Sequence, residues 1–241
     1  MKYRRFVCCS DVHGCHQDPE SNRVLFKFIK DFKPDIRILA GDLWDFAPLR
    51  KKASEDEKRE SMVDDYRAGI DWLHKFQPHH FLRGNHDERL WELAETGNGV
   101  LADYALSGVS EINTIIRKMN CRIYPYHKRD GVMRLGSLKI LHGFHCGINA
   151  ARQTGLIYGA CLFGHVHTID EHSIPGLERR VARSIGCLCS TDLSYASRNP
   201  NTLRQANGWA YGVIAENGQY HTAQAEQIGG KWLIPSDFKE Y

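Results

Sequence analysis

The sequence has 241 residues, of which 42% are hydrophobic and 25% are charged, and its formal net charge is +3. This composition is typical of a globular chain and excludes a disordered one, because enough apolar surface is present to build a core. The small net charge excludes the strongly basic surface of a dedicated nucleic-acid binder. The length suits one core, so we predict a single domain over residues 1–241.

The eight cysteines include no C-x-x-C pair, so neither a zinc ribbon nor a thioredoxin-type motif is predicted. Most of them stand in apolar runs such as Phe6–Cys9, where a reduced thiol behaves as a small hydrophobe. The chain has no apolar signal-peptide core before Asp11 and no run of about 18 apolar residues. We therefore expect a soluble cytoplasmic protein that does not enter a membrane.

Short apolar runs that end abruptly in polar or glycine residues are typical of buried strands. In chain order these runs are Phe6–Cys9, Ile36–Ala40, His80–Arg83, Leu138–Leu141 and Ala160–Phe163. The first three alternate with helical stretches at Pro19–Lys33 and Ser54–Phe76. This βαβα order predicts parallel strands.

The C-terminal third has a different pattern, with short antiparallel strands predicted near 180–188, 208–215 and 219–226. The predicted fold class is therefore α/β, with two mixed β-sheets packed as a sandwich and flanked by helices. Residues 97–130 have no clear pattern, and we treat them as a candidate cap over the functional site. The charged segment 50–66 has the composition of a solvated helix face.

Side chains that bind metals follow each of the five apolar runs. They are Asp11, His13, Asp42, Asn85, His142, His165 and His167. Because ligands of α/β sheets bind at the carboxyl ends of the strands, we expect these side chains to meet. Oxygen donors mixed with imidazole suit Mn²⁺, Fe²⁺, Zn²⁺ or Ni²⁺ better than Ca²⁺ or Cu⁺.

Two further histidines leave alternatives open. His145 follows the same strand as His142, but His142 comes first after the apolar run and precedes a glycine, so we prefer it as the ligand. His145 either contacts the substrate or has no role, and the same two alternatives hold for His16. Trp44 stands between two aspartates and is more typical of core packing than of a substrate platform.

Five segments of the chain resemble, in order, the five motifs of the calcineurin-like metallophosphoesterases. They are Asp11-Val12-His13, Gly41-Asp42-Leu43-Trp44-Asp45, Gly84-Asn85-His86-Asp87, His142-Gly143 and Gly164-His165-Val166-His167. The resemblance covers residues 11–167 and implies a four-layer αββα fold that holds two divalent cations, with Mn²⁺ preferred and Zn²⁺, Fe²⁺ or Ni²⁺ as alternatives.

The resemblance also implies a role for each ligand. Asp11, His13, Asp42 and His167 would hold one cation, and Asp42, Asn85, His142 and His165 would hold the other. Asp42 would then bridge the pair, and a metal-bound hydroxide would attack the phosphorus. His86 resembles the histidine that protonates the leaving oxygen, and Asp45 resembles the carboxylate that favours its imidazolium form.

The substrate class is less well defined by the sequence. Protein phosphatases that resemble this chain continue the second motif with Asp-Arg-Gly, whereas this chain reads Asp45-Phe46-Ala47. The missing arginine counts against a clamp for a phosphomonoester dianion. Arg50, Lys51 and Lys52 lie just beyond this motif and are predicted to contact a substrate, with a nucleic-acid backbone as the candidate.

We therefore predict a phosphodiesterase with nucleic acid as a candidate substrate. A phosphomonoesterase acting on a small molecule is the alternative within the enzyme class. A non-catalytic scaffold, like the retromer subunit that resembles these enzymes, is the alternative of another class. Loss of a ligand or of His86 would favour the scaffold, but all of these residues are present. The tail segments 184–189 and 207–212 resemble compact phage and prophage members of the family.

Overall fold

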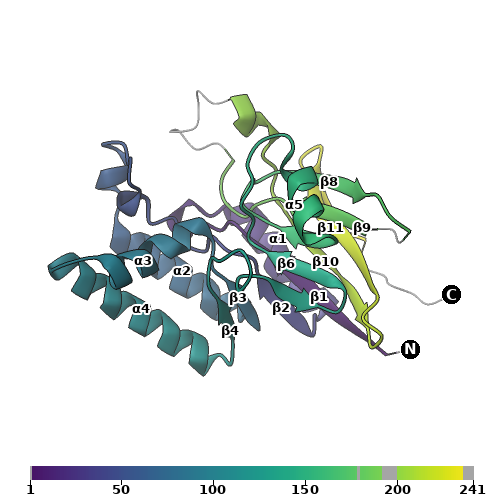
Figure 1. Cartoon of the computed structure of the whole chain (residues 1–241), viewed down its shortest axis with the longest axis horizontal. Helices are drawn as coiled ribbons and strands as arrows, with labels where there is room; N and C mark the ends of the chain where they lie inside the picture. Colours follow the sequence, from purple (N-terminus) through teal and green to yellow (C-terminus); the bar gives the residue numbers. More distant parts are fainter. Residues whose placement is uncertain (1, 178–179, 192–199, 236–241) are drawn as a thin grey trace.

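The apolar runs of the sequence form two β-sheets that pack face to face (Figure 1). The computed structural model describes residues 2–177, 180–191 and 200–235. The strands are β1 (Tyr3–Cys9), β2 (Ile36–Leu39), β3 (His80–Leu82), β4 (Arg122–Tyr124), β5 (Met133–Leu135), β6 (Leu138–Leu141), β7 (Cys161–Phe163), β8 (Ile169–Ile174), β9 (Arg180–Ile185), β10 (Gly208–Ala215), β11 (Tyr220–Ile228) and β12 (Lys231–Leu233). The α-helices are α1 (Pro19–Phe32), α2 (Met62–Phe76), α3 (Asn85–Thr96), α4 (Val100–Lys118) and α5 (Ala150–Tyr158).

The two sheets differ in size and in the way their strands pair. The seven-stranded sheet has the order β12-β11-β10-β1-β2-β3-β4, and the five-stranded sheet has the order β5-β6-β7-β9-β8. Strands β1, β2 and β3 pair in parallel, as the βαβα pattern predicts, and β4, which the sequence did not predict, pairs in parallel with β3. In the C-terminal third, β10 and β11 form the expected antiparallel hairpin, but β9 pairs in parallel with β7 and antiparallel with β8.

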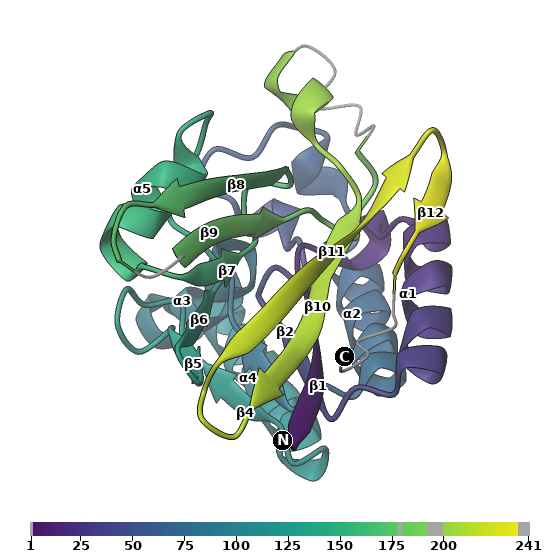
Figure 2. The ribbon, with the colours of Figure 1, turned by 90° about the vertical axis from the view of Figure 1, so that its right-hand side faces the viewer.

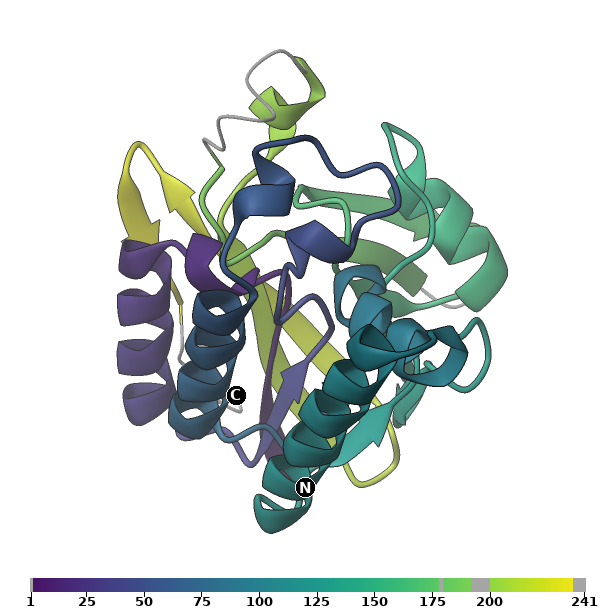
Figure 3. The ribbon, with the colours of Figure 1, turned by 90° about the vertical axis from the view of Figure 1, so that its left-hand side faces the viewer.

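Alternation along the strands produces the layers. On β1, Val7 and Cys9 pack with the helices, whereas Phe6 and Cys8 face the other sheet. Helices α1, α2 and α4 lie along one face of the seven-stranded sheet (Figure 3). Helix α5 covers the outer face of the five-stranded sheet, where it packs on Leu141 and Phe163 (Figure 2). The molecule is therefore a sandwich with helices on both sides, which confirms the predicted fold class.

Helix α2 begins later than the sequence predicts. It starts at Met62, and the Ser61 side chain caps it by accepting a hydrogen bond from Asp64 N at 3.2 Å. Upstream, Ser54 N donates to Glu57 Oε2 at 2.6 Å, and Glu57 N donates to Ser54 Oγ at 3.2 Å. This reciprocal pair resembles the start of a helix, but it closes only a short turn before Ser61 begins the real one.

The segment 97–130 forms α4 and the edge strand β4. Helix α4 places Ala105, Val109 and Ile112 in the core beneath the seven-stranded sheet. At the end of the segment, the Tyr126 hydroxyl donates to the Gly143 carbonyl at 2.9 Å, beside the predicted ligand His142. None of the helices in the described part of the chain is long and apolar enough to cross a membrane.

Candidate metal centre

Two loops at the carboxyl ends of β1 and β2 are held together by their backbones. Asp11 N donates to Gly41 O at 2.9 Å, and His13 N donates to Asp42 O at 3.1 Å. Asp11, His13 and Asp42 all adopt positive φ angles of 57°, 53° and 51°. This region is sparsely populated for residues other than glycine and is found most often in loops that form functional sites.

Glycines allow the loops to approach one another closely. Gly41 has a φ of +100°, and a Cβ there would lie 2.3 Å from His142 Nδ1. A Cβ on Gly84 would lie 2.1 Å from Asp42 Oδ1. A side chain at either position would therefore displace a predicted ligand.

The first predicted set of ligands lies together in the structure. His167 Nε2 lies 3.2 Å from Asp11 Oδ1 and 3.1 Å from His13 Nε2. His13 Nε2 lies 3.9 Å from Asp42 Oδ2. Asp11, His13 and Asp42 form one group whose ligand atoms lie within 4.8 Å of one another.

The second set converges on the other side of Asp42. His142 Nε2 lies 3.1 Å from Asp42 Oδ2 and 3.1 Å from Asn85 Oδ1. His165 joins Asp42 and His142 in a second group of ligand atoms within 4.8 Å. Asp42 thus belongs to both groups, and the residue is only 1% exposed.

The chemistry of these donors fits divalent cations. His142 Nδ1 lies 2.8 Å from the Ala40 carbonyl, so this nitrogen carries a proton and Nε2 of the neutral ring presents a lone pair. That lone pair faces the oxygens of Asp42 and Asn85, which are acceptors as well. Three acceptors that converge without a donor need a shared cation or an additional proton.

The pKa values of the predicted ligands indicate the same need for positive charge at the site. Burial opposes protonation of His142 and His167, but Asp42 and Asp11 outweigh it and raise both pKa values to about 9. Burial also opposes ionisation of Asp42, yet the neighbouring His142 and His86 hold the pKa of Asp42 well below its usual range. Protons on the histidines thus balance the negative charge of the carboxylates, a role that bound cations would take over. Metal binding would therefore have to release these protons.

His86 and Asp45 form a hydrogen-bonded pair. His86 is the second residue of α3, and its Nδ1 bonds to Asp45 Oδ1. Burial lowers the pKa of His86, but the charges of Asp42 and Asp45 outweigh it, and the net shift is upward. The structure adds a second contact, because Asp45 Oδ1 also lies 3.1 Å from His13 Nδ1.

The predicted substrate residues lie on two separate loops. Arg50 forms an ion pair with Glu57 at 2.7 Å, while Lys51 and Lys52 are exposed between β2 and α2. Figure 3 shows this segment arching over one end of the sheets. His145 is half-buried on the loop between β6 and α5.

Several neighbours of the site had no role assigned from the sequence. Cys146 Sγ lies 3.2 Å from His165 Nε2, and Cys189 Sγ lies 3.7 Å from His167 Nδ1. Arg89 donates to the Asp45 carbonyl at 2.8 Å from the first turns of α3. His16, which the sequence left open, bonds to Glu60 at 2.9 Å. For Arg89 the signal was its position one helical turn after His86, whereas the cysteines gave no local signal.

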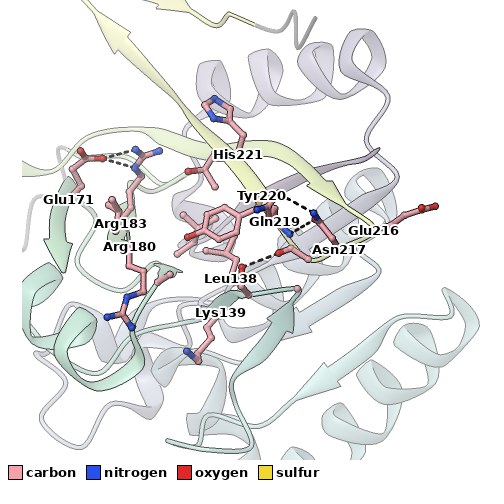
Figure 4. Close-up of a pocket in the computed structure, with 18 residues that line it drawn as sticks. Leu138, Lys139, Glu171, Arg180, Arg183, Glu216, Asn217, Gln219, Tyr220 and His221 are labelled. Atoms are coloured by element: carbon pink, nitrogen blue, oxygen red, sulfur yellow. Dashed lines mark hydrogen bonds and ion pairs between the residues drawn. The ribbon is translucent and has the colours of Figure 1, made fainter. Parts of the chain in front are cut away.

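A separate cleft of about 1150 Å³ opens between β6, β7, β9 and β11 (Figure 4). Three of its charged side chains are engaged, because Arg183 donates to Glu171 at 2.6 Å and Lys139 Nζ donates to Tyr158 O at 2.5 Å. Lys139 stands near the start of β6, whereas His142 follows its end. The described residues that line this cleft include none of the predicted site residues.

The fold and the converging ligands define a class of protein. The chain belongs to the calcineurin-like phosphoesterase family, whose model matches residues 4–168. Phosphoester hydrolysis is the activity after which this family is named. A comparison with curated proteins found no match.

Solved structures resemble the chain over most of its length. A metallophosphoesterase from Sphaerobacter thermophilus is 14% identical, with a TM-score of 0.49 and coverage of 94% of this chain and 89% of that chain. A Vps29 single mutant from Entamoeba histolytica is 10% identical, with a TM-score of 0.48 and coverage of 95% and 96%. A predicted phosphoesterase from Streptococcus pneumoniae is 15% identical, with a TM-score of 0.43 and coverage of 94% and 91%.

Proposed function

We propose that this protein is a binuclear metal-dependent phosphodiesterase, with nucleic acid as its candidate substrate. The observation that carries the proposal is the position of Asp42, a buried carboxylate that belongs to both groups of possible ligands. A shared carboxylate is what two neighbouring divalent cations need, because it offsets their repulsion.

Asp11, His13 and His167 would hold one cation and Asn85, His142 and His165 the other, with Asp42 between them. When bound, the two cations would acidify a water molecule and withdraw charge from the phosphoryl oxygens. Mixed carboxylate, amide and imidazole donors suit Mn²⁺, which we propose as the metal, with Zn²⁺, Fe²⁺ and Ni²⁺ as alternatives.

His86 would protonate the leaving oxygen from Nε2. Its Nδ1 is engaged by Asp45, which holds the ring in place and favours the protonated form. The ring is also tethered through its backbone, since His86 N donates to Asp42 Oδ1 at 2.8 Å. The proton donor and the proposed bridging ligand are therefore fixed relative to each other.

The environment of Phe46 supports a diester substrate. This residue stands where phosphoprotein phosphatases have the arginine that follows the aspartate. Phe46 is 1% exposed, and its ring stacks on that of Trp44 with 5.6 Å between the ring centroids. The position therefore points into the core and offers no clamp for a phosphomonoester dianion. Arg89 lies nearby, but one of its nitrogens is engaged by the Asp45 carbonyl.

The proposal is tested with metal-depleted protein reconstituted with Mn²⁺. Bis-p-nitrophenyl phosphate should be hydrolysed at least as fast as p-nitrophenyl phosphate. A preference for the monoester of more than about tenfold, or ~1.4 kcal/mol of transition-state discrimination, would contradict the diester assignment. Absence of metal-dependent hydrolysis of either ester would contradict the enzymatic one.

The nucleic-acid assignment needs its own experiment. Replacing Lys51 and Lys52 with alanine should flatten the salt dependence of activity on single- or double-stranded DNA. The matched control replaces Lys27 and Lys30, which are exposed on α1. Equal salt dependence in both double variants and the wild type would remove these lysines from the substrate path.

A further inference from the structure

The four predicted histidine ligands each have a second ring nitrogen, and that nitrogen needs a partner. A histidine that coordinates a metal almost always donates its other ring N–H, which fixes the orientation of the ring. For His13 this partner is Asp45, whose Oδ1 lies 3.1 Å from Nδ1. For His142 it is the Ala40 carbonyl, 2.8 Å from Nδ1.

Sulfur occupies this position for the other two histidines. Cys189 Sγ lies 3.7 Å from Nδ1 of His167, whose Nε2 lies 3.2 Å from Asp11 Oδ1. Cys146 Sγ lies 3.2 Å from Nε2 of His165. Each histidine of the Gly164-His165-Val166-His167 motif therefore has one ring nitrogen against a cysteine.

The position of Cys146 distinguishes a positioning role from a ligand role. Among the described residues, Cys146 belongs to no group that also contains Asp42 and His142, whereas His165 does. The Cys146 sulfur is therefore not among the ligand atoms that gather around Asp42 and His142. Since Nε2 faces this sulfur, Nδ1 is the nitrogen left for coordination.

Cys189 is held firmly in its place. Its carbonyl accepts a hydrogen bond from Asn207 Nδ2 at 2.7 Å, and its side chain is fully buried. It also pairs with Gln17 through an isolated β-bridge, which ties it to the loop that follows Asp11 and His13. These contacts fix the backbone of Cys189 from two sides, and its sulfur lies within 4.8 Å of ring nitrogens of His13 and His167.

We propose that Cys146 and Cys189 are positioning residues, which accept the outer N–H of His165 and His167 and set their coordinating nitrogens. His165 would then coordinate through Nδ1, and His13, His142 and His167 would coordinate through Nε2. This inference rests on the proposed binuclear site. Sulfur is a weaker acceptor than a carboxylate or a carbonyl, so these two rings are held less tightly than His13 and His142.

The first experiment measures Mn²⁺ binding to metal-free protein by calorimetry. Cys146→Ala should lower the affinity for one of the two cations by about 10–100-fold, the usual effect of losing such a hydrogen-bond partner. Cys146→Ser keeps an acceptor and should retain most of the affinity. Cys15→Ser is the matched control, because Cys15 is the other cysteine with an exposed side chain.

The outcomes separate this inference from the proposed function. If the wild type binds two cations and Cys146→Ala binds both equally well, the positioning role is wrong while the binuclear site stands. If the wild type binds fewer than two, the binuclear site itself is wrong. Unchanged unfolding of metal-free Cys146→Ala would exclude a merely structural loss.

The second experiment requires no variant and therefore covers the buried Cys189. Nitrogen-15 NMR of the Zn²⁺-loaded protein reports which nitrogen of each histidine is protonated. His165 should show a protonated Nε2, and His13, His142 and His167 should show a protonated Nδ1. A protonated Nδ1 on His165, or a sulfur-to-metal charge-transfer band after Co²⁺ substitution, would overturn the proposal.

Discussion

Asp45 contacts two histidines that have different predicted tasks. Its Oδ1 bonds to Nδ1 of His86, the proposed acid, and lies 3.1 Å from Nδ1 of His13, a predicted ligand. One carboxylate therefore orients both a proton donor and a metal ligand. The sequence suggested only the first of these contacts, because the motif resemblance pairs Asp45 with His86.

Replacing His86 should separate proton donation from metal binding. His86→Ala should keep both metals and lose about 10²–10⁴-fold in rate on a dinucleotide. The loss should be much smaller on bis-p-nitrophenyl phosphate, because p-nitrophenolate leaves without needing a proton. Initial rates on the two substrates, with metal analysis of the same samples, provide the check.

Asp45→Asn serves as the companion variant and should differ from His86→Ala. It should show the same dependence on the leaving group in weaker form, together with reduced metal affinity through His13. Equal rate losses on both substrates in His86→Ala would indicate that His86 stabilises phosphoryl charge instead. Loss of a metal from His86→Ala would indicate that His86 is a metal ligand.

At the scale of single elements, strands β1, β2, β3, β6 and β7 were predicted to within a few residues because each is a short apolar run with a sharp polar end. The start of α2 was predicted too early, because the reciprocal Ser54–Glu57 pair has the same local pattern as a helix start. Strands β4, β5, β8 and β12 were missed. β4, β5 and β12 have three residues each, and their pairing depends on partners distant in sequence.

The turn between β3 and α3 gives an element-scale prediction. Gly84→Ala would place a Cβ 2.1 Å from Asp42 Oδ1, so either Asp42 or the start of α3 must shift. We expect a loss of about 1–3 kcal/mol in unfolding free energy, together with weaker metal binding. Urea unfolding of metal-free protein and a Mn²⁺ titration measure the two effects.

Gly108→Ala is the matched control on α4. Its Cβ would meet only Leu90 Cδ2, at an ordinary contact distance of 3.6 Å. An alanine inside a helix should be more stable than glycine by about 0.5–1 kcal/mol. If Gly84→Ala behaved like Gly108→Ala, the close approach at Asp42 would have no structural consequence.

The pairing of β3 with β4 should make stability depend on pH. Burial, followed by the charges of His79 and Arg122, lowers the pKa of His80, whose Nδ1 lies 3.2 Å from the Tyr124 hydroxyl. Below about pH 6.5 the unfolded chain binds a proton on this histidine that the folded chain resists. The stability contributed by neutral His80 is therefore complete above that pH and is lost as the pH falls.

His80→Asn keeps an acceptor for Tyr124 and removes the titration. The difference in unfolding free energy between pH 7.5 and pH 5.5 should be smaller in this variant than in the wild type. Urea unfolding at the two pH values measures it, and His74→Asn on the exposed face of α2 is the control. An identical pH dependence in His80→Asn and the wild type would contradict the prediction.

At the scale of the whole molecule, the site joins the two sheets. Asp11, Asp42 and Asn85 follow strands of the seven-stranded sheet, whereas His142 and His165 follow strands of the five-stranded sheet. The sequence predicted that these strand ends meet, because every run is followed by a metal-binding side chain. It could not show which sheet each strand joins, since that depends on packing between Phe6, Ile38, Ile140 and their neighbours.

The contacts of the cysteines show the same limit. Cys146 lies 19 residues before His165, and Cys189 lies 22 residues after His167. No spacing pattern links either cysteine to its histidine. Their proximity arises because α5 and β7 return the chain to the end of β6, and because the segment after β9 runs beside the Asp11 loop, where Leu188 N donates to Asp11 O at 3.0 Å. Such contacts become visible only once the sheets are assembled.

One buried carboxylate, that of Asp42, is proposed to serve two cations. The most direct measurement is elemental analysis of protein saturated with Mn²⁺, in the wild type and in Asp42→Asn. We predict two equivalents per chain for the wild type and weakened binding of both cations in the variant. A folded wild type that saturates at one equivalent, or an Asp42→Asn variant that loses only one cation, would contradict the account.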